Sequence, residues 1–329
     1  MATSHAAVWQ RATVVDSTAL TDDIRRIVLA PDRPAKVDAG AHIDVRVPIG
    51  GVLDRRSYSV VDAGPDGRTL AISVLDSPRS RGGARAMHAL RPGDTVEITQ
   101  PIVDFPLRVG AAHYVVLAGG IGITAVMGMA SVLRSVGADY TLVYAGRSRP
   151  ALAYVEQVQN AHGDRLRLHI TDEGNPLDVT ELVGGVEPGT ELYLCGPIRL
   201  MDAVRRAWIE RELPYPDLRF ETFGNSGWFA PEDFVVRIPR LGAEVTVRAT
   251  ETMLEALEAA EVDLMFDCRK GECGLCEVRV LDLDLDGDID HRDVFYSERQ
   301  KDSRGTMCCC VSRAVAPPGG TAVVTIDIS

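Results

Sequence analysis

The sequence predicts three domains in a fixed order: an antiparallel β-barrel, a parallel α/β domain and a small α+β domain. Three observations support this fold class. Short runs of alternating apolar and polar residues come first, buried strands separated by helix-length segments follow, and six of the seven cysteines lie at or beyond Cys268. A chain of 329 residues is also too long for one ordinary domain, since most domains contain roughly 100 to 200 residues.

The first domain is expected over residues 1–108. Its runs are broken by Gly, Pro and Asp, as in antiparallel strands with one buried face. They read ATVV, IRRIVLA, HIDVRVP, RSYSVV, TLAISVL and TVEIT. The simplest way to bury one face of so many short strands is closure into a small barrel.

The second domain is expected over residues 109–226, between the segments PLRVGAAH and FGNSGWFAPED. Its buried strands read YVVLA, YTLVYAG, LRLHIT and ELYLCG, and helix-length segments such as Met201 to Arg211 separate them. This alternation predicts a parallel sheet with helices on its faces.

One stretch of this domain has the length of a membrane span. Tyr114 to Leu133 is a 20-residue run without a charged residue. It contains Gly119, Gly120, Gly122 and Gly128, however, and its strand-like Val and Leu residues precede the first glycine. We therefore interpret it as strand, loop and helix.

The third domain is expected over residues 233–329. It begins with the alternating strands FVVRI and EVTVRA, continues with the amphipathic segment TMLEALEAAE and the cysteines, and ends with VVTIDI. The predicted order is strand, strand, helix, cysteine loop, strand.

The charge of the chain excludes some classes of partner. A net charge of −12 and a pI near 5.1 argue against nucleic acid and against an anionic membrane surface, because both are bound by clustered Lys and Arg. The N-terminus has no basic segment followed by an apolar core, so we expect a cytoplasmic protein.

The cysteines carry the most specific motif. In DCRKGECGLCEV, four residues separate Cys268 from Cys273 and two separate Cys273 from Cys276. This is the plant-type ferredoxin spacing for a 2Fe-2S cluster, with the fourth ligand far downstream. Gly271 and Gly274 would let the loop wrap closely around the sulfurs. Zinc is the alternative, although zinc sites usually show two CxxC-like pairs. Spacing alone leaves the fourth ligand open among three consecutive residues, Cys308, Cys309 and Cys310.

An acidic segment overlaps this domain. DLDLDGDIDHRD has the spacing of an EF-hand loop, which makes a calcium-binding protein the alternative of a different class. The segment follows a strand-like run instead of a helix, and its twelfth position is Asp instead of Glu, so a solvated acidic hairpin is the preferred interpretation. The residues concerned are Asp282, Asp284, Asp286, Gly287, Asp288 and Asp293.

Two motifs in the first domain suit a flavin. The strand RRSYSV supplies a cation for phosphate, an aromatic surface for the ring and a hydroxyl near its reactive nitrogen. The loop SRGGARAMH places a glycine pair before a helix, where an anion binds well. The candidate residues are Arg56, Ser57, Tyr58, Ser59, Arg81, Gly82, Gly83 and Ala84.

A nicotinamide nucleotide is predicted from the second domain. AGGIGITAV follows a strand and opens a helix, so its backbone could approach a pyrophosphate. GRSR follows the next strand, where Arg147 or Arg149 could meet a 2′-phosphate. The candidate residues of the first turn are Gly119, Gly120, Gly122, Ile123 and Thr124.

Taken together, the motifs and the terminal segments GDIDHRDVF and CVSRA resemble the phthalate dioxygenase reductase and vanillate demethylase reductase family, over nearly the whole chain. The resemblance implies a Greek-key flavin barrel, a nucleotide domain and a plant-type ferredoxin of β-grasp fold. It implies that Arg56 holds the flavin phosphate and that Tyr58 and Ser59 line the ring. It selects Cys310 as the fourth cluster ligand, which leaves Cys308 and Cys309 as packing thiols.

The same resemblance assigns the remaining positions. Ala84 replaces a serine of the family's FMN phosphate loop, so FMN is expected with FAD as the alternative. The turn Cys195, Gly196 and Pro197 would lie beside the nicotinamide, and Phe223 would cover the flavin. NADH is expected over NADPH.

These signals combine into one function. NADH delivers two electrons as a hydride and the cluster accepts one at a time, so a flavin that holds two and passes them singly is needed between them. We expect a monomeric reductase component of a multicomponent oxygenase. Electron transfer requires no catalytic acid, base or nucleophile, and Ser59, Cys195 and Phe223 are expected near the flavin and nicotinamide. A flavin reductase that releases free reduced flavin is the alternative.

The expected partner is a terminal oxygenase, either of Rieske type or a haem-thiolate monooxygenase. From Asp233 onward there are 19 Asp and Glu against 11 Lys and Arg, so the ferredoxin part is acidic. An acidic face predicts a basic docking surface on the partner.

Overall fold

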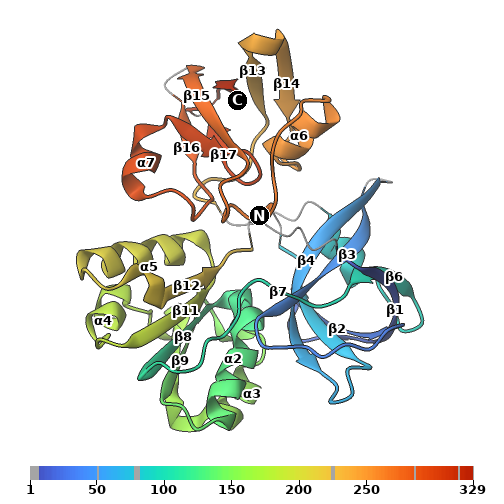
Figure 1. The fold of residues 1–329 in the computed structure, drawn as a ribbon, viewed down its shortest axis with the longest axis vertical. Coiled ribbons are helices and arrows are strands. Elements are labelled where there is room, and N and C mark those ends of the chain that lie inside the picture. The colour runs from blue at the N-terminus through green and yellow to red at the C-terminus, as the bar shows by residue number, and fades with distance from the viewer. Residues whose placement is uncertain are drawn as a thin grey trace. The chain divides into compact units, whose positions relative to one another are not determined.

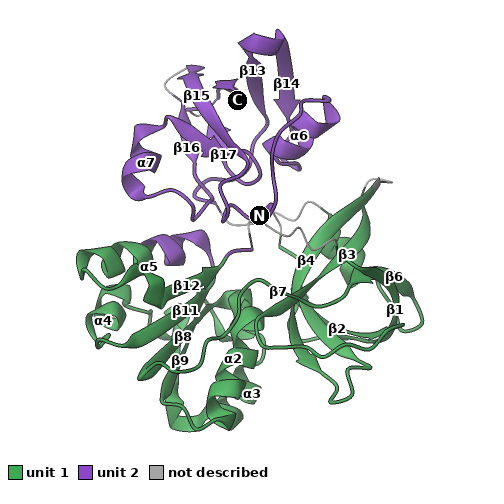
Figure 2. Ribbon diagram, viewed as in Figure 1, with its two compact units in different colours: residues 1–196, 203–221 green, residues 197–202, 222–329 purple. Residues whose placement is uncertain are grey.

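The computed structural model describes residues 7–49, 52–77, 82–223, 227–284, 287–317 and 319–328. The chain forms two compact units, residues 1–196 with 203–221 and residues 197–202 with 222–329 (Figure 2). We call them unit 1 and unit 2. No helix of the described residues has the length and apolar character needed to cross a membrane.

Unit 1 begins with an antiparallel barrel (Figure 1). The ring runs β1-β2-β5-β4-β3-β6 and closes between β6 and β1, with β7 added beside β3. Because β3, β4 and β5 are neighbours and β6 returns beside β3, the order is a Greek key, as expected. The strands are β1 (Trp9–Ala19), β2 (Ile24–Pro31), β3 (Ala41–Ile49), β4 (Val52–Ala63), β5 (Leu70–Leu75), β6 (Thr95–Thr99) and β7 (Ile102–Val103), with helix α1 (Gly83–His88) after β5.

Alternation explains the barrel. Buried and exposed side chains alternate along the first half of β1, and the inward residues form one apolar core that includes Ile27, Ile43, Ile72 and Ile98. A strand with period two can bury only one face, so closure of the sheet on itself is the outcome that the pattern predicts.

Unit 1 continues with a five-stranded parallel sheet in the order β10-β9-β8-β11-β12. Its three central strands β9, β8 and β11 are mostly buried, as parallel strands covered on both faces are, whereas the edge strands β10 and β12 are more exposed. The elements are β8 (His113–Gly119), α2 (Ile123–Ser135), β9 (Tyr140–Gly146), α3 (Val155–His162), β10 (Leu166–Ile170), α4 (Val179–Gly184), β11 (Thr190–Cys195), α5 (Ile198–Glu210) and β12 (Leu218–Glu221). The strand-loop-helix interpretation of the long uncharged run is confirmed by β8 and α2.

Unit 2 is an α+β domain. A five-stranded mixed sheet has the order β14-β13-β19-β15-β17, and a second, two-stranded sheet pairs β16 with β18. The elements are β13 (Phe234–Ile238), β14 (Ala243–Val247), α6 (Met253–Ala259), β15 (Glu277–Leu283), β16 (Asp288–Asp290), α7 (Glu298–Ser303), β17 (Thr306–Cys308), β18 (Arg313–Val315) and β19 (Ala322–Asp327). The strand-like run before the acidic segment is β15. The sequence pattern did not predict β16 to β18 or α7, since elements of three to six residues are too short to show a period.

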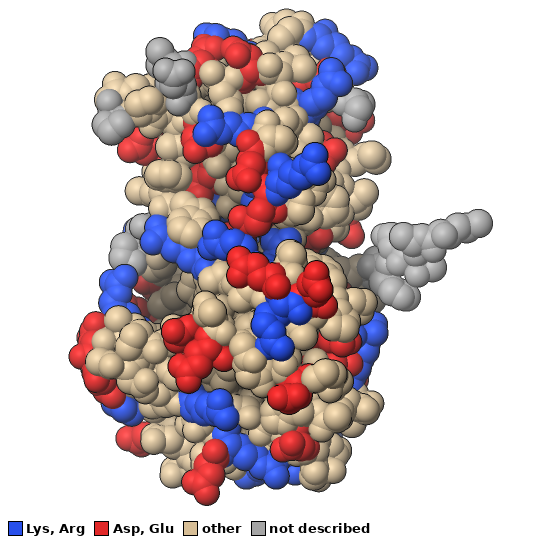
Figure 3. Space-filling model, turned by 90° about the vertical axis from the view of Figure 1, so that its left-hand side faces the viewer, with Lys and Arg blue, Asp and Glu red and all other residues tan. Residues whose placement is uncertain are grey.

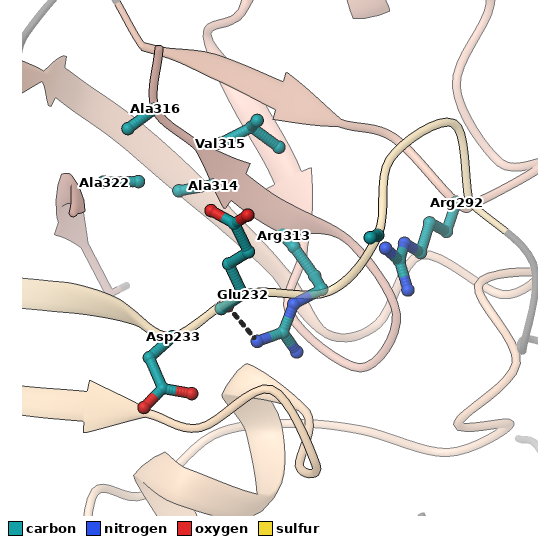
Figure 4. A pocket seen from close by; sticks show the side chains of 9 residues that line it. Glu232, Asp233, Arg292, Arg313, Ala314, Val315, Ala316 and Ala322 are labelled. Carbon is teal, nitrogen blue, oxygen red and sulfur yellow. Dashed lines mark hydrogen bonds between the residues drawn. The ribbon is translucent and has the colours of Figure 1, made fainter. Parts of the chain in front are cut away.

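Buried arginine holds the loops of unit 2 together. Figure 4 shows a small pocket across which Arg313 extends. Its guanidinium donates to the carbonyls of Glu232, Arg248 and Glu251 at 2.6–2.9 Å. Three carbonyl partners fix this side chain as a structural link between β18 and the loops that flank β13 and β14.

Candidate functional site

The predicted flavin strand is β4, which lies between β3 and β5 in the barrel. Ser59 is 6% exposed, and its hydroxyl oxygen has no hydrogen-bond partner in the part of the chain that the structure describes. A buried polar group without a partner costs about 1–3 kcal/mol. The position therefore fits a ligand that would hydrogen-bond to this hydroxyl.

The neighbours of Ser59 on this strand differ in their availability. Tyr58 is half-buried against the barrel core, and burial raises its pKa, so its hydroxyl stays protonated. Ser57 is not available in the same way, because its hydroxyl donates to the buried carboxylate of Asp44 at 2.5 Å.

The structure brings the cation of β4 beside the glycine pair. A Cβ built on Gly83 would lie 3.1 Å from Cγ and 3.2 Å from Nε of Arg56. Gly82 has φ 97° in the left-handed region and precedes α1. The guanidinium is paired with Asp54 at 2.5 Å and its side chain is 19% exposed. A cation beside a glycine turn can hold a phosphate.

Two further residues of this loop were predicted to bind cofactor. Ala84 is half-buried against the barrel core, so it supplies no side-chain donor. Arg81 lies outside the described residues.

The two turns of the nucleotide motif meet at the ends of neighbouring strands. β8 ends at Gly119 and its neighbour β11 ends at Cys195, with Ala118 opposite Cys195. A Cβ on Gly122 would overlap the carbonyl group of Cys195. Only glycine allows this backbone contact, so the two predicted motifs form one structure.

This meeting point is where the strand order changes direction. The chain runs outward from β8 through β9 to β10, and then starts again on the other side of β8 with β11 and β12. Open α/β sheets bind ligands at such a switch point, beyond the carboxyl ends of the strands.

The first turn of α2 stabilises the glycine turn that precedes this helix. Ile123 and Thr124 are buried, and the Thr124 hydroxyl donates to the carbonyl of Ile121 at 2.9 Å. Gly120 has φ 54°, with open space where a Cβ would stand. The Thr124 side chain therefore stabilises the turn, and the backbone at Gly120 is left open.

The remaining nucleotide residues lie at the rim of the sheet. Gly196 is half-buried and Pro197 is exposed. Arg149 is held by two hydrogen bonds of 2.8 Å to Glu173. Arg147 is exposed, and among the described residues its guanidinium has no hydrogen bond or ion pair. Of the two arginines, Arg147 is the one available to a ribose or a 2′-phosphate.

Within unit 1 the flavin and nucleotide motifs are joined by packing. Helix α2 packs against β4 of the barrel and also against β8, β9 and β11 of its own sheet. Because β4 carries Tyr58 and Ser59 and α2 begins directly after Gly122, the two predicted ligand sites share one pair of packed elements.

In unit 2 the cysteine loop directs backbone amides at sulfur. The amides of Lys270 and Glu272 donate to the Cys268 sulfur at 3.4 and 3.5 Å. Amide donors of this kind stabilise cluster thiolates.

Both glycines of this loop are required by close contacts. Gly271 and Gly274 each have φ 75°. A Cβ on Gly274 would overlap the ring of Phe295, and a Cβ on Gly271 would lie 2.7 Å from Cγ2 of Val311 and 2.9 Å from Cα of Asp293. The segment that follows β16 therefore wraps tightly over the loop.

The three consecutive cysteines lie next to Cys276. The Cys309 amide donates to the carbonyl of Cys276 at 3.1 Å. The proximity of these thiols lowers the pKa of Cys276, whereas proximity to Cys276 and burial raise the pKa of each of the three. Charge on Cys268 also contributes to the raised pKa of Cys310. The choice of Cys310 as the fourth ligand stays a prediction.

No three His, Cys, Asp or Glu side chains of the described residues are placed to hold one metal ion. A 2Fe-2S cluster divides four thiolates between two irons, so its ligands need not converge on a single point. The amide donors at Cys268 fit that cluster.

Several carboxylates of the acidic segment already have partners within the protein. Asp284 pairs with Arg237 at 2.8 Å, and Asp288 pairs with Arg304 at 3.1 Å. Asp293 is buried and accepts hydrogen bonds from the Ser312 hydroxyl and the Tyr296 amide. Asp286 lies outside the described residues. The segment joins strands β15 and β16, not two helices, and this argues against the EF-hand interpretation.

One contact to the cysteine loop was not predicted from the sequence. Thr222 lies directly before the predicted flavin-covering residue Phe223, which is half-buried. The Thr222 amide donates to Glu272 of the cysteine loop at 2.7 Å, and its hydroxyl donates to the carbonyl of Lys270 at 2.7 Å. The partners are 50 residues apart, and no local pattern signals such a pairing.

Comparison with known proteins agrees with this geometry. A family model described as "2Fe-2S iron-sulfur cluster binding domain" matches residues 236–315. Phenoxybenzoate dioxygenase subunit beta of Ectopseudomonas oleovorans is 36% identical over 91% of this chain and 90% of its own length. The solved structure of phthalate dioxygenase reductase, described as modular for electron transfer from pyridine nucleotides to [2Fe-2S], aligns with TM-score 0.73 and 28% identity over 97% of this chain and 98% of its own.

The chain belongs to the phthalate dioxygenase reductase family.

Family membership fixes the chemistry. The protein is an oxidoreductase, the reductase component of an oxygenase, which carries electrons from NADH through FMN to a 2Fe-2S cluster. The family architecture also occurs within a longer chain. An intact type IV self-sufficient cytochrome P450 monooxygenase is 36% identical with TM-score 0.65, covering 97% of this chain and 41% of its own.

Proposed function

We propose a specific set of residues for this electron path. Residues 1–108 would bind FMN, residues 109–226 would bind NADH, and residues 233–329 would bind the cluster. The observation that carries the proposal is the packing of α2 on β4, which joins the unpaired Ser59 hydroxyl to the Gly122–Cys195 turns. When bound, the flavin converts a two-electron hydride transfer into single electrons for the cluster.

At the flavin, each residue has a separate task. Arg56, with the backbone of Gly82 and Gly83, holds the phosphate end. Tyr58 offers an aromatic face, and Ser59 offers its buried hydroxyl to the ring. Ala84 contributes no side-chain donor to the phosphate. Arg81 and Phe223 complete the predicted set, as a phosphate contact and as the cover of the ring.

At the nucleotide, the backbone does most of the binding. Gly119, Gly120 and Gly122 allow close approach of the pyrophosphate, and we expect the turn from Cys195 to Pro197 to lie beside the nicotinamide. Arg147 lies where the ribose end is expected.

At the cluster, we propose Cys268, Cys273, Cys276 and Cys310 as the ligands. The amides aimed at the Cys268 sulfur stabilise its thiolate and position the loop.

The partner is proposed to be a terminal oxygenase, of Rieske or haem-thiolate type, that docks beside the cysteine loop. Met265 is 73% exposed and Phe266 is 38% exposed, directly before Cys268. The acidic residues Glu261, Asp263 and Asp267 flank them and are exposed. An apolar centre with a charged rim is the usual anatomy of a transient interface, so we expect an apolar socket bordered by Lys and Arg on the partner.

The docking proposal is local and does not rest on overall charge. On the face shown in Figure 3, acidic and basic side chains are mixed and form no single patch. We also propose that the protein is a cytoplasmic monomer.

The test is cofactor analysis of the purified protein. We expect FMN by mass after extraction, two irons per chain as the cluster type requires, and reduction of cytochrome c by NADH. Weak flavin retention without iron would favour the free flavin reductase instead. Zinc in place of iron, with a featureless visible spectrum, would contradict the proposal.

A further inference from the structure

A short segment of unit 2 lies directly on the cysteine loop. A Cβ on Gly271 would lie 2.9 Å from Cα of Asp293, and a Cβ on Gly274 would overlap the ring of Phe295. We call residues 293–296 the cover segment. It touches the loop at both of the glycines that the cysteine motif contains.

The cover segment is buried except for one ring. Asp293, Val294 and Tyr296 are buried, whereas Phe295 is 44% exposed. The Val294 amide also donates to the carbonyl of Gly271 at 3.0 Å. On this side of the loop, the segment therefore lies between the loop backbone and solvent, with the Phe295 ring outermost.

One residue makes most of the bonds that hold the cover segment in place. The Asp293 carboxylate accepts the Tyr296 amide at 3.0 Å and the Ser312 hydroxyl at 3.2 Å. Nδ1 of His291 donates a third hydrogen bond to it at 3.2 Å. The carbonyl of Asp293 accepts the Lys301 ammonium at 2.9 Å. The side chain thus joins the segment to the residue before β18, and the main chain joins it to α7.

The Asp293 carboxylate is charged although it is buried. Burial raises its pKa, but the hydrogen bond from His291 and the positive charge of Lys301 lower it more, so the pKa lies below its ordinary value. A buried charge is tolerated only where hydrogen bonds satisfy it. The carboxylate therefore keeps its three donors in one arrangement. An apolar side chain of the same size would make none of these bonds.

We propose that Asp293 is a positioning residue that holds the cover segment closed and so limits the access of water and small molecules to the cluster. This inference rests on the proposed function, in which the loop beneath the segment carries three of the cluster ligands. The shell around a metal site controls solvent access, and solvent exposure is one of the factors that set the properties of an iron-sulfur cluster. Opening of the cover segment should therefore expose the cluster.

The experiment compares the same change at two buried carboxylates in the intact, cofactor-loaded protein. Asp293→Asn removes the charge and one acceptor oxygen from the cover segment. Asp290→Asn is the matched control, because this carboxylate binds the Arg292 guanidinium and the Trp228 amide instead. Ser312→Ala removes a single donor to Asp293 and leaves the carboxylate in place.

Two measurements report on the cover segment without depending on turnover. Hydrogen–deuterium exchange, read by mass spectrometry on peptides that contain Val294, follows opening of the bond to Gly271. Loss of visible absorbance in the presence of an iron chelator follows access to the cluster. Iron per chain, measured before the chelator is added, shows whether the cluster is assembled.

We expect iron content to be unchanged in all three variants. In Asp293→Asn, exchange of the cover segment and loss of the cluster to the chelator should both become about tenfold faster, since a charged acceptor is lost from the closed state only. Ser312→Ala should raise both rates about threefold. Asp290→Asn should leave both rates near the parent value.

Three results would overturn the inference. Unchanged exchange in Asp293→Asn, with iron retained, would show that the carboxylate does not hold the segment. Faster exchange without faster loss of the cluster would show that the segment does not limit access. An equal rise of both rates in Asp290→Asn would show a general loosening of unit 2.

Two further outcomes are covered by the same set of variants. If Asp293→Asn does not fold, Ser312→Ala decides the question, and unchanged rates in that variant would overturn the inference. A parent protein without iron would contradict the proposed function. The exchange comparison would then still test whether Asp293 holds the cover segment, so the two failures are distinguishable.

Discussion

At the scale of single residues, the clearest evidence for a ligand site is a buried hydroxyl without a hydrogen-bond partner among the described residues. Ser59 is buried and its hydroxyl has no partner among the described residues, whereas the neighbouring Ser57 hydroxyl is bound to Asp44. Two serines of one strand therefore have different tasks: one stabilises the barrel and the other is available to a ligand.

This difference predicts the effect of Ser59→Ala. Loss of one hydrogen bond to the flavin ring, worth about 1–1.5 kcal/mol, should slow reduction of the flavin by NADH about tenfold. Stopped-flow absorbance of the loaded protein measures the rate, and bound flavin per chain should remain unchanged. Ser59→Thr keeps the hydroxyl and should restore most of the rate. An unchanged rate in the alanine variant would remove Ser59 from the site.

The two arginines after β9 allow a matched comparison of nucleotide choice. Arg147 has a guanidinium without a partner in the described chain, while Arg149 is bound to Glu173. Arg147→Ala should lower kcat/KM for NADPH about five- to tenfold more than for NADH, since a charge-assisted contact to the 2′-phosphate is lost. Arg149→Ala should leave the ratio of the two values unchanged. Equal effects of the two variants would count against the assignment of Arg147.

At the scale of elements, the sites lie where strands end and loops touch. Gly122 contacts the carbonyl group of Cys195 at the ends of β8 and β11, and Gly274 lies under the Phe295 ring in the cysteine loop. In both places the glycine backbone touches a neighbouring segment directly. A side chain at either glycine would force that segment to move.

Gly122→Ala tests the contact between the two nucleotide turns. The added Cβ overlaps the Cys195 carbonyl, and overpacking of this kind typically costs about 1–3 kcal/mol. We expect KM for NADH to rise at least about fivefold. Gly128→Ala in the same helix is the control, because its Cβ would meet only Ala39 at 3.8 Å. Similar KM values in both variants would contradict the predicted contact.

The contact between Thr222 and Glu272 predicts a separate effect on the second electron transfer. Glu272 accepts the amide of Thr222 at 2.7 Å, so it fixes the residue before Phe223 to the cysteine loop. Glu272→Ala should slow transfer from flavin to cluster several-fold, as expected when a positioned contact of about 1–2 kcal/mol is lost, and leave hydride transfer unchanged. Rapid-mixing spectra separate the two steps. Glu272→Gln keeps an acceptor oxygen and should behave like the parent; a slowed hydride step in Glu272→Ala would point to a general structural role.

At the scale of the whole molecule, the sequence predicted what local patterns encode. Period-two alternation predicted the barrel, glycine-interrupted apolar runs predicted the parallel sheet, and cysteine spacing predicted the loop that binds the cluster. Contacts between distant residues, such as Arg56 with Gly83 and Thr222 with Glu272, leave no trace in local periodicity. The short strands around the cysteine loop, such as β16 and β18, were missed because three residues cannot show a period.

The partner surface is the last property of the whole molecule that can be tested without knowing the partner. Cytochrome c, a basic redox protein, serves as the probe. Neutralising the rim with Glu261→Gln, Asp263→Asn and Asp267→Asn should lower the rate of cytochrome c reduction several-fold at low ionic strength, where the Debye length reaches about 30 Å at 0.01 M, and should flatten its dependence on salt. Reduction of ferricyanide by NADH should not change.

The control for this test carries the same change in net charge elsewhere. Asp22→Asn, Asp164→Asn and Glu187→Gln neutralise three exposed acids of unit 1. If steering depended only on net charge, both triple variants would slow cytochrome c reduction equally, and the face beside Cys268 would lose its special role. A larger effect of the rim variant, together with a slowed rate in Phe266→Ala, would place electron exit at the cysteine loop, because an apolar contact and a local field would then act at the same surface.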